Sequence, residues 1–171
     1  MRLYPIALVA LLLASPAVAS APEDAACVVG RLSAADVETI VDESLAGGSN
    51  QAVARLTPPL DACSEGRDWS SRRRADATAY AIGIVDRTVL GRRLAAKAID
   101  TGALDRWFAR QSVEFRTTAF MGMSEAEMTA TFETLSDHEV PRATLERDGH
   151  MIGGYLAALV IIERIESGLE L

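Results

Sequence analysis

The two histidines of this chain are its most obvious candidates for metal chemistry. His138 lies between two acidic residues, and His150 follows Glu146 by four residues. Residues four apart share one face of a helix, so Glu146 and His150 could bind the same metal ion. Two histidines and a carboxylate form a ligand set that zinc accepts. Their spacing matches no established metal motif, so solvated histidines are the alternative to a site formed by His138, His150 and Glu146.

A basic segment supplies a second candidate site. Residues 67–97 contain eight basic and three acidic residues, although the whole chain has a net charge of −7. The planar guanidinium group binds phosphate and carboxylate through two parallel hydrogen bonds, so clustered arginines could bind an anionic partner. The alternative is that acidic segments of the same chain neutralise them. The candidate residues are Arg72, Arg73, Arg74, Arg92 and Arg93.

Established catalytic motifs are absent. The chain has no G-x-S-x-G elbow, no P-loop and no dinucleotide-binding glycine pattern. Glu163 follows the most apolar run, and a carboxylate among apolar side chains is a candidate for acid–base chemistry. We therefore assign no catalytic residue and expect no cofactor. The absence of catalytic motifs favours a protein without enzymatic activity, and an enzyme is the alternative. Four aromatic side chains could form core or line a ligand groove: Trp107, Phe108, Phe115 and Phe120.

Cys27 and Cys63 are the only cysteines. Two cysteines in one exported domain most simply pair with each other. A redox or reactive thiol is the alternative, but neither residue belongs to a C-x-x-C motif or a local basic cluster.

The apolar residues recur at helical rather than strand spacing, which predicts an all-α protein. Few aromatic residues and no alternating segments agree with this fold class. We expect a single-domain bundle of about five to seven helices, with one disulfide and a buried C-terminal helix. Apolar residues occupy nearly all faces of that last helix, which indicates burial, and its glycines and alanines allow neighbouring helices to pack closely. The expected helices cover residues 33–46, 49–57, 71–99, 103–120, 124–135 and 141–165, the last either continuous or interrupted near residue 149.

Two capping signals and one proline pair define the expected boundaries. Ser124 and Glu127 match a capping box, and Ser33 with Asp36 resembles one. Pro58 and Pro59 predict the end of the second helix, because a residue before proline is disfavoured in the α conformation.

Residues 1–19 match a secretory signal peptide, with Arg2 before an apolar run and small residues at 17–19. Cleavage after Ala19 is expected, with Ala21 as the alternative. The apolar run is too short to span a bilayer, so no membrane span is expected in the mature chain. Residues 20–171 would then form the helical domain, of which residues 20–30 are a loose leader. The expected location is the periplasm or the extracellular space.

These features favour an exported module that binds a partner in the bacterial envelope. The expected partner is an envelope protein or an anionic envelope component. An acidic exported chain is a poor candidate for nucleic-acid binding, which depends on phosphate neutralisation. The first alternative is a small metal- or carboxylate-dependent enzyme. The second is a carrier of a small apolar ligand, with its cavity between the aromatic helix and the last helix.

Overall fold

The computed structural model describes residues 21–120 and 123–169, which form eight helices and no strand. An all-α bundle is therefore confirmed, with one helix more than the expected range. The predicted signal peptide lies outside the described residues. The helices are α1 (Ala21–Val29), α2 (Ala34–Leu45), α3 (Ser49–Ser64), α4 (Ser71–Ala96), α5 (Thr101–Ala109), α6 (Val113–Thr118), α7 (Glu125–His138) and α8 (Arg142–Glu166).

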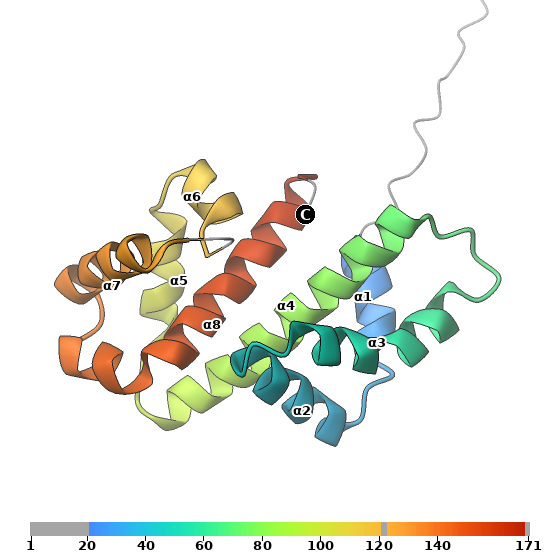
Figure 1. Ribbon diagram of the computed structural model, residues 1–171, viewed down its shortest axis with the longest axis horizontal. Coiled ribbons are helices and arrows are strands. Elements are labelled where there is room, and N and C mark those ends of the chain that lie inside the picture. The colour runs from blue at the N-terminus through green and yellow to red at the C-terminus, as the bar shows by residue number, and fades with distance from the viewer. Residues whose placement is uncertain (1–20, 121–122, 170–171) are drawn as a thin grey trace, which may run out of the picture.

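The two longest helices, α4 and α8, form the centre of the molecule and run in opposite directions (Figure 1). Glycines allow this close packing. A Cβ atom on Gly83 would lie 3.1 Å from Ile162 and 3.3 Å from a main-chain oxygen of α8. Figure 1 shows α5, α6 and α7 on one side of the pair, and α1, α2 and α3 on the other.

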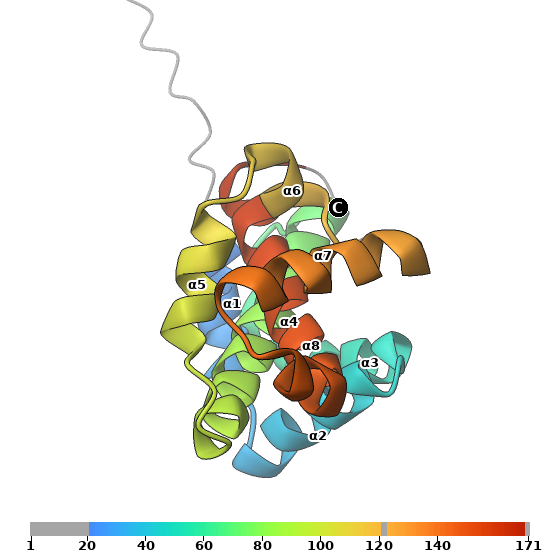
Figure 2. The same ribbon diagram turned by 90° about the vertical axis from the view of Figure 1, so that its left-hand side faces the viewer.

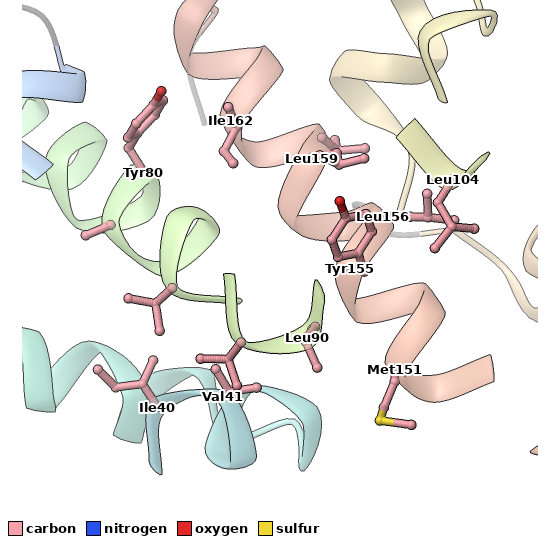
Figure 3. Close-up of a cluster of buried hydrophobic side chains, with 14 of the residues drawn as sticks. Ile40, Val41, Tyr80, Leu90, Leu104, Met151, Tyr155, Leu156, Leu159 and Ile162 are labelled. Atoms are coloured by element: carbon pink, nitrogen blue, oxygen red, sulfur yellow. The ribbon is translucent and has the colours of Figure 1, made fainter. Parts of the chain in front are cut away.

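Among the described residues, α8 buries more side chains than any other helix. These side chains face α4, α5 and α2 (Figure 3). Leu156 and Ile152 are fully buried, as is Leu90 on α4. This confirms the prediction of a buried C-terminal helix. In the described residues, no helix combines the length and the apolar character needed to cross a membrane.

A disulfide between Cys27 and Cys63 ties α1 to the end of α3, with an S–S distance of 2.10 Å. This confirms the predicted pairing. The segment expected as a loose leader is instead largely helical, because α1 covers most of it. Ala25 and Val28 of this helix lie in the core, and a buried carboxylate, Asp24, binds an arginine of α4. Burial against the rest of the fold therefore orders a short segment made mostly of small residues.

The prediction that Pro58 and Pro59 end the second helix is wrong, because α3 continues to Ser64. A proline within a helix lacks the N–H that would bond the carbonyl four residues earlier. The carbonyls affected belong to residues 54 and 55, which are exposed and accessible to water. Leu56 and Leu60 are buried on the opposite face, so packing favours a continuous helix.

The region expected as one aromatic helix is two helices, α5 and α6, separated near Ser112. The Ser112 hydroxyl accepts a hydrogen bond from the Phe115 N–H and thereby caps α6. At Ser124 the predicted capping box is present, because the side chains of Ser124 and Glu127 each accept from the other's N–H. The last helix is continuous through Gly149.

Candidate functional site

The five candidate arginines are all paired with carboxylates of the same chain. Arg73 on α4 binds Asp24 of α1, which is only 2% exposed. The other four arginines form five ion pairs among the described residues: Arg72 with Asp76, Arg74 with Asp61, Arg92 with Glu38, and Arg93 with both Glu38 and Asp42. The charges of these arginines on α4 are thus neutralised by carboxylates of α1, α2 and α3 and by Asp76 of α4 itself. This arrangement speaks against an open anion-binding patch.

The candidate metal residues are only partly placed. Glu146 and His150 lie on the first turns of α8, where both are exposed. The side chain of His138, at the end of α7, lies outside the described part of the chain. Among the described residues, no group of three His, Cys, Asp or Glu is positioned to hold a metal ion. Convergence of His138 with the other two residues therefore stays a prediction.

A groove of about 390 Å³ lies between α7 and the first turns of α8, and we call it the α7–α8 groove. Phe132 and Leu145 supply its apolar floor, one from each helix. The Phe132 ring lies close to Gly153, where a Cβ would be 3.4 Å from the ring. The α7–α8 groove therefore combines a firmly packed apolar base with an open, water-exposed mouth.

The mouth of the α7–α8 groove is acidic. Glu133 and Asp137 lie one turn apart on α7, and Glu146 faces them from α8. Among the described side chains that line the groove, Arg142 is the only cation, and it is 3.3 Å from Glu146 on its own helix. No described lysine or arginine pairs with Glu133 or Asp137. The α7–α8 groove therefore carries negative charge that the described basic residues leave uncompensated.

Helix α7 is mostly exposed, and among its described side chains only Thr131 and Leu135 are buried. Figure 2 shows its N-terminal half extending beyond its neighbours. Met128, on this half, is one of the few large apolar side chains that stay exposed. A signal for this surface was present in the sequence, because the stretch between Arg116 and Arg142 holds five acidic residues and no lysine or arginine.

The residues of the α7–α8 groove suit recognition better than catalysis. Its carboxylates are exposed to water and therefore hydrated. Thr129 and Ser136 add hydroxyl groups. An apolar floor with a charged rim is the usual composition of a surface that anchors an amphipathic partner.

Glu163, the other carboxylate singled out from the sequence, pairs with Arg116 at 2.6 Å. Together with Phe108 it lines a second groove, between α4, α5 and α8. Trp107 lies in the core, and the partly buried Phe115 and Phe120 pack against it through edge-to-face contacts, with centroid separations of 5.6 Å for Trp107–Phe115 and 6.2 Å for Phe115–Phe120. Of the four aromatic residues, only Phe108 therefore lines this groove.

No protein-family model, curated protein or solved structure matches this chain. Its function must therefore be inferred from its own residues.

Proposed function

We propose that the chain is an exported, non-enzymatic interaction module whose α7–α8 groove binds a basic amphipathic segment of a partner protein. The observation that carries this proposal is the uncompensated acidic rim above an apolar floor. Leucine-like side chains of the partner would pack on Phe132 and Leu145, and its lysines or arginines would lie beside Glu133 and Asp137. The partner is therefore cationic rather than anionic.

Two further features support export. The first 19 residues have the order of a signal peptide, and a disulfide is typical of proteins in oxidising compartments. The paired arginines favour a protein partner over an anionic envelope component, since an anion would have to displace carboxylates already bound.

Fluorescence anisotropy with a labelled amphipathic peptide tests the proposal. The probe has leucines on one face and lysines on the other, and the comparison peptide has glutamate in place of every lysine. We expect the lysine peptide to bind and the glutamate peptide to fail. We also expect affinity for the lysine peptide to fall with added salt, because screening weakens contacts between exposed charges.

A pair of double variants separates the groove from the net charge of the protein. Glu133→Gln with Asp137→Asn should weaken binding of the lysine peptide about three- to tenfold, since each exposed charge contributes modestly. Glu65→Gln with Asp68→Asn makes the same charge change at exposed positions after α3 and should leave binding nearly unchanged. Equal losses in the two double variants, or equal binding of the two peptides, would refute the proposal.

A further inference from the structure

The second groove, which we call the α4–α5–α8 groove, has a volume of about 270 Å³. Its floor is apolar: Ile84 from α4, Phe108 from α5, and Leu159 and Ile162 from α8. Figure 3 shows Ile162 of α8 on the side toward Tyr80 of the neighbouring α4, and Leu159 farther along the same helix. Pockets for drug-sized ligands typically have volumes of at least about 300 Å³. The α4–α5–α8 groove is slightly smaller, so it suits a molecule below that size.

One end of the α4–α5–α8 groove is acidic. The buried Tyr80 hydroxyl donates a hydrogen bond to Oε1 of Glu166. Burial, followed by this carboxylate, raises the pKa of Tyr80 to about 12, so the hydroxyl stays protonated and remains a donor. Glu163 lies one turn before Glu166 and accepts from Arg116 at 2.6 Å. Two carboxylates and one guanidinium thus meet here, which leaves one negative charge.

The other end of the α4–α5–α8 groove is neutral. Arg87 is 3.3 Å from Asp105, and the Tyr155 hydroxyl donates to the same carboxylate at 2.9 Å. Arg87 is the only cation that lines the groove. Because Asp105 already compensates it, an anionic ligand gains little at this end.

We propose that the α4–α5–α8 groove binds a small molecule with one ammonium group and a short apolar body. The ammonium group would lie beside Glu166, and the body would cover Phe108 and Ile162. A carboxylic acid of the same size would place its charge beside Glu163 and Glu166, and a neutral alcohol would leave Glu166 without a counter-ion. This site is separate from the α7–α8 groove and does not depend on the function proposed there.

Two-dimensional NMR titration of the full chain tests this site with three matched probes: n-hexylammonium, hexan-1-ol and hexanoate. We expect hexylammonium to shift amide signals of residues around the α4–α5–α8 groove, to bind about two- to fivefold more tightly than hexan-1-ol, and to exceed hexanoate by a larger factor. Equal binding of all three probes would show partition into apolar surface and would overturn the proposal. Shifts confined to α7, or no saturable shift, would overturn it as well.

Two variants locate the charge. Glu166→Gln keeps an oxygen that can accept from Tyr80 but removes the negative charge, and because Glu166 is exposed it should weaken hexylammonium binding about two- to fivefold while leaving hexanol binding unchanged. Glu65→Gln, at an exposed position after α3, makes the same chemical change outside both grooves and should have no effect on hexylammonium. An unchanged affinity in Glu166→Gln would refute the proposal, and its thermal unfolding curve would show that the fold is retained.

Discussion

Arg73 donates two hydrogen bonds to the carboxylate of Asp24, from Nε at 2.6 Å and from Nη2 at 2.8 Å. The same guanidinium lies 5.0 Å from the ring centre of Trp69, so one face of it is covered by an aromatic ring. This pair joins α1 to α4 next to the disulfide. Among the six described ion pairs of the five candidate arginines, it alone has a carboxylate that is almost completely buried.

Removing the Asp24 carboxylate should loosen α1. We expect Asp24→Ala to lower the melting temperature by several degrees, because it leaves a guanidinium without its bidentate partner. Asp61→Ala removes the exposed partner of Arg74 and is the matched control, with little expected effect. Circular dichroism during heating measures both variants. Equal melting temperatures for the two would contradict the structural role of Asp24.

Asp86 should make stability depend on pH. It is 8% exposed, its Oδ1 has no hydrogen-bond partner, and burial raises its pKa to about 7. The unfolded chain ionises at the ordinary value of 3.8, so this contribution to stability is complete below pH 3.8 and declines as the pH rises to about 7. The expected loss across that interval is about 4 kcal/mol.

Denaturant unfolding at a series of pH values measures the Asp86 effect. Asp86→Asn cannot ionise, so its free energy of unfolding should change much less between pH 4.5 and 7. Asp148 has the opposite effect on the pH dependence of stability, because Lys97 lowers its pKa. The stability that Asp148 contributes is lost only as the solution becomes more acidic than this pH range. If wild type and Asp86→Asn share one pH profile, Asp86 ionises normally in the folded protein.

The disulfide should stabilise the folded protein mainly by restricting the conformations of the unfolded chain. It joins residues 36 positions apart, and closing a loop of that length stabilises a protein by about 3 to 4 kcal/mol in the chain-entropy description. Dithiothreitol should therefore shift the denaturation midpoint of the wild type to lower denaturant. The double variant Cys27→Ala with Cys63→Ala is the control, because its midpoint should not respond to dithiothreitol. A response in the control would mean that the reductant acts elsewhere.

Two glycines of α8 should respond differently to alanine. A Cβ on Gly149 would meet nothing within 4 Å, so Gly149→Ala should raise the free energy of unfolding by up to about 1 kcal/mol through helix propensity alone. A Cβ on Gly154 would lie 2.9 Å from Leu45 and 3.1 Å from Leu90. The same propensity gain should there be offset by displaced side chains. Denaturant unfolding compares the variants, and equal gains would contradict the close packing at Gly154.

The sequence was most informative where local chemistry alone decides the structure. The Ser124 capping box, the Cys27–Cys63 pair and the buried last helix depend on short-range patterns or on composition, and the structure confirms all three. It was least informative where distant residues decide. Helix α1 depends on Arg73, which lies far from it in the chain, and α3 passes through Pro58 because Leu56 and Leu60 are buried.

The candidate sites follow the same division. The charge asymmetry was visible in the sequence, but the partners of Arg93 were not, since Glu38 and Asp42 reach it only after α2 packs on α4. Both grooves depend on how α8 packs against neighbouring helices. The spacing of residues within a single helix does not predict that packing. Glu163 was recognised from its apolar surroundings, whereas Glu166 gains its importance only from Tyr80 on another helix.

Helix α8 forms one wall of both grooves and has no break between them. A rise of about 1.5 Å per residue puts Leu145 and Ile162 about 25 Å apart along its axis. Two ligands could thus be held at once, at a constant spacing and without steric conflict. A bivalent molecule that joins a basic peptide to an alkylammonium group would need a linker of at least that length, and a shorter one could occupy only one groove at a time.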